Sequence, residues 1–146
     1  MGAKSILLVD PSRLRMPFFS EILQGSGTVL EFADADKALS AVKRGLTVDV
    51  AVMYYRIALT PLIQSLRRLQ PRAGIVAYGA PRMDTPLGVD AYLLEPILSA
   101  ELEGTVELYL KRRRNEGIAT WAEASSLAAA ERRAANLARH KPSLAR

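Results

Sequence analysis

The sequence predicts an α/β domain built on a doubly wound, five-stranded parallel sheet, and three observations point to it. Short apolar runs, typical of buried strands, alternate with segments of helical periodicity over roughly the first 114 residues. The runs are nearly continuous, as expected for strands that are covered on both faces. A covering segment lies between successive strands, and parallel pairing requires such crossovers.

The expected elements follow one another in a regular order. Strands are predicted at residues 5–10, 28–33, 48–54, 73–79 and 91–95. A first helix follows the turn at Pro11 and runs to Gln24, and further helices are predicted at residues 35–45, 61–69 and 99–114. The first helix either starts near Pro17, where a missing N–H costs nothing, or kinks there. Asp34 or Asp36 can cap the second helix. Pro81 and Pro86 argue against a full helix between the last two strands, so a short turn or irregular loop is expected.

Composition restricts the functions open to the chain. Its 146 residues suit one domain with an appendage. There is no cysteine and one histidine, His140, which excludes disulfides and thiolate metal sites and argues against a Ser-His-Asp mechanism. No apolar run approaches the roughly 18–20 residues of a membrane span, and the N-terminus lacks a secretory signal. We therefore expect a cytoplasmic protein.

The net charge of +5 is unevenly distributed along the chain. Residues 1–110 carry 11 Lys/Arg and 12 Asp/Glu, a net charge of −1, whereas residues 111–146 carry 9 and 3, a net charge of +6. This asymmetry indicates a separate interaction segment. We therefore divide the chain into an α/β domain at residues 1–114 and a basic, Ala-rich tail at residues 115–146, with a helix stop or hinge at residues 115–117.

The tail is predicted to be helical over residues 118–140, because good helix formers dominate it. One thin apolar stripe runs along it, formed by Leu127, Ala130, Ala134 and Leu137, with Trp121 near its start. A stripe this small needs a packing partner: the domain, a second copy of the chain or another protein. The basic residues of segment 111–146 could instead contact nucleic acid or an anionic surface. They are scattered, however, and about thirty residues are too few for a DNA-binding domain with its own core.

Ligands of parallel sheets bind beyond the carboxyl ends of the strands, so the residues there decide the chemistry. Over about residues 4–113, the segments ILLVD, DADKALSAVKRG, VDVAVMYYRIALTPLIQSLRRL and GVDAYLLEP, in this order and spacing, resemble the receiver domain of two-component response regulators. The resemblance implies a flavodoxin-like fold with strand order 2-1-3-4-5, a role in signal transduction and protein partners. It also places Tyr92 at the position of a conformationally coupled aromatic residue, which we expect to be partly buried.

Most chemical positions of that family are replaced in this chain. After the first strand the family has two acids that hold Mg²⁺, where this chain has Asp10 and Pro11. The resemblance puts Tyr54 at the phosphate-accepting aspartate, Gly79 at the threonine or serine, and Glu95 at the lysine. One carboxylate beside a proline is a poor Mg²⁺ site. A phenol does not replace the carboxylate nucleophile, and Glu95 repels an incoming phosphoryl group.

We therefore expect a degenerate, non-phosphorylatable receiver-like domain that is not an enzyme, holds no metal or cofactor, and acts by binding a protein or a second copy of itself. Asp10 should cap a turn or pair with a nearby base. Tyr54 should fill the vacated acidic pocket, with its hydroxyl bonded to Asp10 or Glu95. Tyr55 and Arg56 either face a partner or lie in a solvated loop.

Three alternatives stay open at this point. The first is a nucleic-acid-associated regulator that acts through the basic tail. The second is a receiver that still accepts phosphate by an unconventional route. The third is an unrelated flavodoxin-like domain.

Overall fold

The computed structural model describes residues 4–118, with side chains up to Arg112. The chain divides into two units, residues 1–113 and 114–146, and the fold reported below is that of the first. The tail residues Trp121, Leu127, Ala134 and Leu137 lie outside the described residues, and so does almost all of the helix predicted at residues 118–140.

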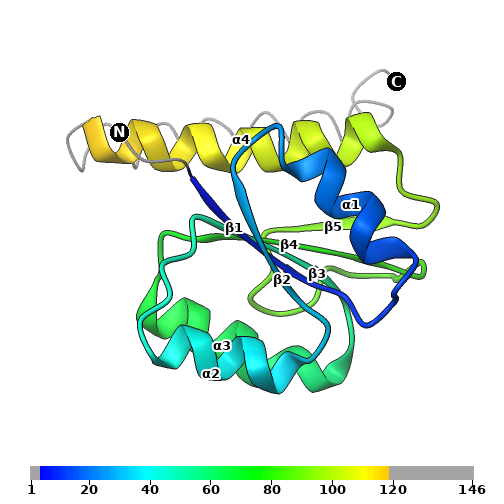
Figure 1. The fold of residues 1–146 in the computed structure, drawn as a ribbon, viewed down its shortest axis with the longest axis horizontal. Coiled ribbons are helices and arrows are strands. Elements are labelled where there is room, and N and C mark those ends of the chain that lie inside the picture. The colour runs from blue at the N-terminus through cyan, green and yellow to red at the C-terminus, as the bar shows by residue number, and fades with distance from the viewer. Residues whose placement is uncertain (1–3, 119–146) are drawn as a thin grey trace, which may run out of the picture. The chain divides into compact units, whose positions relative to one another are not determined.

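Five strands form one parallel sheet with the order β2-β1-β3-β4-β5 (Figure 1). The strands are β1 (Ser5–Val9), β2 (Thr28–Phe32), β3 (Val50–Tyr54), β4 (Gly74–Gly79) and β5 (Ala91–Leu94). The helices are α1 (Arg15–Leu23), α2 (Ala35–Lys43), the short 3-10 helix η1 (Ile57–Leu59), α3 (Thr60–Leu69) and α4 (Ser99–Ile118). The predicted fold class and strand order are confirmed.

Helices cover both faces of the sheet, which makes the central strands almost wholly buried. Helices α1 and α4 lie on one face and α2 and α3 on the other (Figure 1). Because strand side chains alternate between faces, Ile6 and Leu8 of β1 pack toward α1 and α4, whereas Leu7 and Val9 pack toward α2 and α3. The continuous apolar runs of the sequence follow from this two-sided burial.

The helix ends follow local chemistry. Helix α1 starts at Arg15, so Pro17 lies in its first turn, where N–H groups have no partner within the helix. Asp34 caps α2, since its Oδ1 accepts a hydrogen bond from the Asp36 N–H at 2.8 Å. Gly45, with a φ of +106°, follows the end of α2 in a conformation that favours glycine.

Helix α4 runs further than the sequence predicts. A stop or hinge was expected at residues 115–117, but the backbone is helical to Ile118. The expected stop is therefore wrong. A single interior glycine such as Gly117 costs only about 1 kcal/mol relative to alanine, and the Arg and Glu residues beside it favour a helix.

The connection between β4 and β5 contains no helix. Residues 80–90 contain turns, bends and irregular backbone. The prediction of a missing fourth helix is confirmed, and Pro81 and Pro86 explain it, because proline interrupts helical hydrogen bonding. Within this segment Val89 packs into the core, while Met83 and Leu87 are fully exposed.

No helix within residues 4–118 is long and apolar enough to span a lipid bilayer.

Candidate functional site

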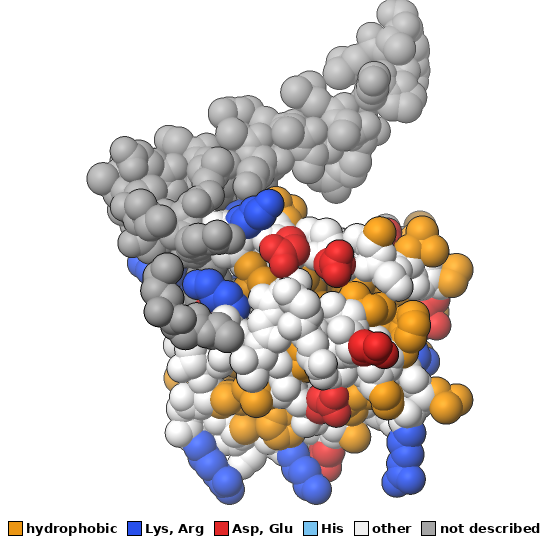
Figure 2. All heavy atoms as spheres, turned by 45° about the horizontal axis from the view of Figure 1, so that its top comes forward, with side chains coloured by type: hydrophobic (Ala, Val, Ile, Leu, Met, Phe, Trp, Pro, Cys, Tyr) orange, Lys and Arg blue, Asp and Glu red, His pale blue; other side chains and the backbone are white. Residues whose placement is uncertain are grey.

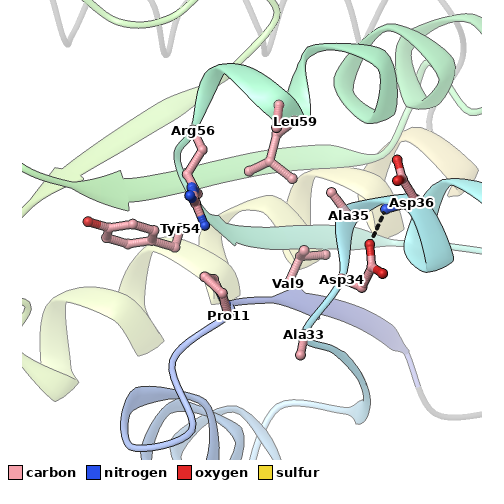
Figure 3. Close-up of a pocket in the computed structure, with 10 residues that line it drawn as sticks. Val9, Pro11, Ala33, Asp34, Ala35, Asp36, Tyr54, Arg56 and Leu59 are labelled. Carbon is pink, nitrogen blue, oxygen red and sulfur yellow. Dashed lines mark hydrogen bonds between the residues drawn. The ribbon is translucent and has the colours of Figure 1, made fainter.

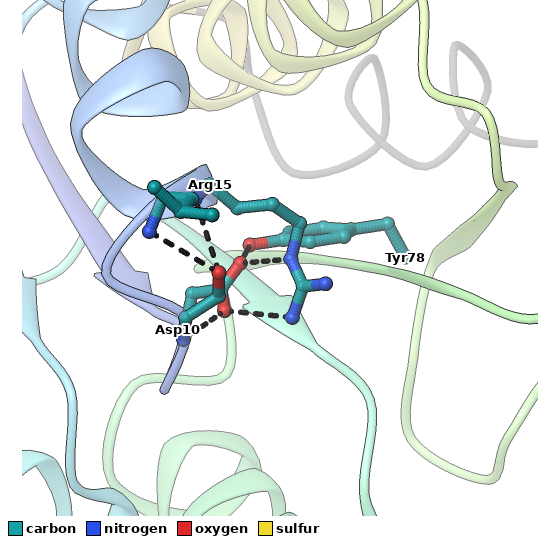
Figure 4. Close-up of polar contacts among 5 residues, drawn as sticks. Asp10, Arg15 and Tyr78 are labelled. Carbon is teal, nitrogen blue, oxygen red and sulfur yellow. Dashed lines mark hydrogen bonds and ion pairs between the residues drawn. The ribbon is translucent and has the colours of Figure 1, made fainter.

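Asp10 lies directly after β1 at the carboxyl edge of the sheet, and it is completely buried. Its carboxylate accepts four hydrogen bonds (Figure 4). They come from the Ser12 N–H at 2.8 Å, the Tyr78 hydroxyl at 2.5 Å, and Nε and Nη2 of Arg15 at 3.0 Å each. A carboxylate has about four acceptor positions, so this one is fully used. Asp10 thus has both expected roles, as a cap of the following turn and as partner of a base.

Arg15, the first residue of α1, supplies the positive charge beside Asp10. Its side chain is 33% exposed, and it forms a bidentate ion pair with the Asp10 carboxylate. The hydrogen bond to Asp10 raises the pKa of the guanidinium, which keeps it charged. The same guanidinium lies over the Tyr54 ring, 4.1 Å from its centroid. An internal cation therefore stands next to Asp10, which corresponds, in the resemblance to receiver domains, to an acid that holds Mg²⁺.

The tyrosine that binds Asp10 is Tyr78 of β4, not Tyr54 as the sequence suggested. The two residues are register partners on neighbouring strands. Tyr78 is completely buried, with the Phe19 ring packed edge-on at 5.0 Å. Burial raises the pKa of its hydroxyl far above the ordinary range, and the hydrogen bond to Asp10 raises it further. The hydroxyl therefore keeps its proton and donates a hydrogen bond to the carboxylate.

Tyr54 is half-buried at the end of β3, and its ring packs between Arg15 and Tyr78. Its hydroxyl makes no hydrogen bond to a described residue, so the predicted bond to Asp10 or Glu95 is wrong. The physical reason is that Arg15, Tyr78 and Ser12 already occupy the Asp10 carboxylate. Tyr54 contributes a ring surface to the site rather than a hydroxyl.

The Tyr92 side chain of β5 packs against the backbone of Gly79 at the end of β4. A Cβ added to Gly79 would lie 2.8 Å from the Tyr92 hydroxyl. That hydroxyl donates a 2.6 Å hydrogen bond to the Ala80 carbonyl, and the Tyr92 ring meets Tyr55 edge-on. Tyr92 is thus the partly buried aromatic that was predicted. It occupies space that any side chain at position 79 would need.

Glu95 and Pro11 complete the set of strand-end residues. Glu95 follows β5 and is exposed, and its peptide bond to Pro96 is cis. Its backbone N–H donates to the Gly79 carbonyl at 2.8 Å. Pro11 is exposed and presents no ligand atom from its side chain.

These residues do not fit the Mg²⁺ ion that the receiver fold implies. The first acid, Asp10, has no free acceptor position, the second is Pro11, and the third position is Tyr54 with its phenol. A hard divalent cation needs several oxygen ligands. Among the described residues, no group of three or more His, Asp or Glu side chains is placed to hold a metal.

Arg15 and Tyr78 were not predicted as site residues, although the sequence holds signals for both. Period-two alternation along β4 places Val76 and Tyr78 on the face that also receives Val52 and Tyr54 of β3. Arg15 follows Asp10 by five residues, at the start of the next helix. A base at that distance from a buried acid is a natural partner for it.

Comparison with solved structures finds the same fold in receiver domains. The chain is similar to a response regulator receiver protein from Sinorhizobium medicae WSM419, with 25% identity, a TM-score of 0.66, and coverage of 76% of this chain and 97% of that one. A CheY-like receiver domain protein from Methanospirillum hungatei JF-1 has 19% identity and a TM-score of 0.68, with 77% and 98% covered. The signal receiver domain of a putative Luxo repressor protein from Vibrio parahaemolyticus has 14% identity and a TM-score of 0.70, with 79% and 95% covered.

No protein-family model matches the sequence, and no curated protein matches it either. The likeness to receiver domains therefore rests on the fold.

Proposed function

We propose that the protein is a degenerate receiver-like regulator of cytoplasmic signal transduction that acts by binding a protein and does not accept a phosphoryl group. The observation that carries this proposal is the saturated carboxylate of Asp10. In place of a metal, the chain's own Arg15 neutralises it, and Tyr78 and Ser12 fill the remaining acceptor positions.

The chemistry of acyl-phosphate formation supports the same reading. That reaction needs a carboxylate nucleophile and positive charge where the phosphoryl oxygens develop charge. Tyr54 is not a carboxylate, and Glu95 is negative where a cation would be needed. Gly79 offers no hydroxyl, and Tyr92 fills the adjoining space.

The test is incubation of the full chain with acetyl phosphate and Mg²⁺, followed by intact mass measurement. We expect no gain of a phosphoryl group, in the wild type or in Tyr54→Asp, because Arg15 still holds Asp10 and Glu95 still repels the donor. A receiver domain with its acids intact serves as the positive control. A stoichiometric, hydroxylamine-sensitive mass increase in the wild type overturns the proposal.

Exposed apolar side chains support a protein partner. Leu14 after β1, Ile57 after β3 and Leu98 after β5 are 88%, 81% and 67% exposed. All three belong to the connections that leave the carboxyl edge of the sheet, Ile57 as the first residue of η1, and they follow the strand ends whose residues replace the family's chemistry. Figure 2 shows hydrophobic side chains exposed among acidic ones on the side that α1 and α4 cover. Apolar groups gathered on a surface are typical of contact sites.

A pull-down with the full chain tests where a partner binds. The triple change Leu14→Asp, Ile57→Asp and Leu98→Asp should abolish capture if the strand-end loops form the contact. The pair Leu127→Asp and Leu137→Asp should abolish it if the tail stripe forms the contact. Capture that survives both sets of changes contradicts a protein contact at either place.

A second candidate function is contact with nucleic acid through the basic segment, favoured by the net charge of +6 on residues 111–146. Binding of this kind weakens steeply with salt because it releases counterions. It should also weaken when Arg132, Arg133 and Arg139 are changed together to Gln. Salt-sensitive binding that ignores the Leu127 and Leu137 changes would favour this candidate over the packing of the apolar stripe.

A further inference from the structure

A cavity of about 450 Å³ lies beyond the ends of β1, β2 and β3 (Figure 3). It stands at the point where the sheet's crossovers change direction, since β1 has β2 on one side and β3 on the other. Ligands of open parallel sheets bind at this position, and the volume is within the range of small-molecule sites. Asp10 does not line this cavity, but Pro11 and Tyr54 do, and the Tyr54 ring also packs against Arg15 of the Asp10 network.

Opposite charges stand on opposite sides of the cavity. Arg56, from the loop after β3, reaches into it from one side, and Asp34 and Asp36 at the start of α2 lie on the other (Figure 3). None of the ion pairs among the described residues involves any of the three. One oxygen of Asp34 caps α2, which leaves its second oxygen for another donor. The cavity thus holds an anion-binding group and a cation-binding pair that do not neutralise each other.

The wall between these charges is apolar. Val9, Ala35 and Leu59 line it, with Leu59 and Val9 facing each other across the opening (Figure 3). Apolar walls favour methylene groups. Two carboxylates at the start of α2 repel an anion, and the guanidinium opposite them repels a lone cation. The arrangement matches a ligand that carries both charges, one at each end.

We propose that this cavity binds a small zwitterion with a carboxylate at one end, an ammonium or guanidinium group at the other, and a short methylene chain between them. Basic amino acids and ω-amino acids belong to this class. Arg56 binds the carboxylate through its planar pair of N–H groups, and Asp34 and Asp36 bind the cation. The cavity shares Pro11 and Tyr54 with the positions that bear on phosphorylation, but the proposed ligand contacts are Arg56, Asp34 and Asp36, so either proposal can fail without the other.

Titration of the ¹⁵N-labelled full chain with 6-aminohexanoate, followed by NMR, tests the site. Hexanoate and hexylamine, which each carry one of the two charges, are the matched probes. We expect 6-aminohexanoate to shift the amide signals of Ala35 and Leu59 and to bind at least ten-fold more tightly than either probe. Equal affinity for the three compounds, or no shifts at these residues, overturns the proposal.

Two variants test which residues bind each end of the ligand. Arg56→Gln should weaken binding of 6-aminohexanoate about ten-fold and leave hexylamine unaffected, because it removes one charge-assisted contact. Asp36→Asn should weaken it to a similar degree and leave hexanoate unaffected. Arg72→Gln, which changes an exposed arginine outside the cavity, is the control and should bind as the wild type does. Wild-type affinity in both Arg56→Gln and Asp36→Asn overturns the proposed site.

Discussion

Replacing Tyr78 with phenylalanine removes one oxygen atom from the centre of the Asp10 network. The ring keeps its edge-on contact with Phe19, at 5.0 Å between centroids, because that contact does not involve the hydroxyl. The change therefore isolates a single hydrogen bond, the one from Tyr78 to the buried carboxylate at 2.5 Å.

The expected loss follows from the burial of the acceptor. A hydrogen bond to a charged group contributes about 1.5–3 kcal/mol, and a buried acceptor that loses its donor cannot turn to water instead. Asp10 is 0% exposed, but it keeps its bonds to Arg15 and Ser12. We expect Tyr78→Phe to lower the free energy of unfolding by about 2 kcal/mol.

Tyr54→Phe is the matched control. Tyr54 is the register partner of Tyr78, and its hydroxyl has no hydrogen-bond partner among the described residues. Removing that hydroxyl should change the free energy of unfolding by less than about 0.5 kcal/mol, as is usual for changes that break no contact.

Urea unfolding followed by far-ultraviolet circular dichroism measures both variants. Circular dichroism is preferable to fluorescence because the single tryptophan, Trp121, lies in the tail. With a denaturant slope of roughly 2 kcal/mol per molar urea, Tyr78→Phe should move the midpoint down by about 1 M at unchanged slope. Equal losses for the two variants, or a larger loss for Tyr54→Phe, would refute the assignment of Tyr78 as the donor to Asp10.

Three further predictions concern the same edge of the sheet. Because burial raises the pKa of the Tyr78 hydroxyl, the folded protein keeps a proton that the unfolded chain releases above its ordinary pKa of about 10. The contribution of Tyr78 to the free energy of unfolding is fully present below about pH 10 and falls by up to about 1.4 kcal/mol per pH unit above it. Above about pH 10 the wild type should therefore lose stability more steeply than Tyr78→Phe. Arg15→Met, which leaves the buried Asp10 without its cation, should cost about 2–3 kcal/mol, less than for a fully buried pair because Arg15 is 33% exposed. Adding Asp10→Asn should recover part of that loss in urea unfolding, and no recovery would contradict the pairing. Gly79→Ala should cost about 1 kcal/mol by displacing the Tyr92 hydroxyl from its hydrogen bond. The cost should shrink in a Tyr92→Phe background, and an unchanged cost would contradict the contact.

The sequence predicted the fold well because burial on both faces of a parallel sheet leaves a strong pattern. Apart from Ser5, the runs at β1, β3 and β4 contain no charged or strongly polar residue, as two-sided burial requires. Pro81 and Pro86 likewise predicted the missing helix, since proline acts locally. The end of α4 was not predictable in the same way, because one glycine in a helix is a small cost that its neighbours outweigh.

The hydrogen-bond partners of the site were harder to predict than the fold. The resemblance drew attention to Tyr54, because it replaces the phosphate acceptor. Tyr78 lies on β4, two strands away from β1, and contacts Asp10 across 68 positions of sequence. Such a contact depends on strand order and side-chain direction together, and neither is encoded near Asp10 itself. The cavity was missed for the same reason, since Asp34 was assigned only its role as a helix cap.

Charge neutralisation at Asp10 bears on how this protein can be regulated. In a site that awaits a cation, binding changes the charge beside the carboxylate. Here Arg15 is covalently part of the chain, so that charge is constant, and the Tyr92 side chain is held against Gly79 by its bond to the Ala80 carbonyl. If the protein does not accept a phosphoryl group, as proposed, a signal has to act through binding. Only a ligand or partner that binds two conformations with different affinity can shift their populations. The loops around the strand ends and the cavity beside Arg56 are the described surfaces where such a difference can arise.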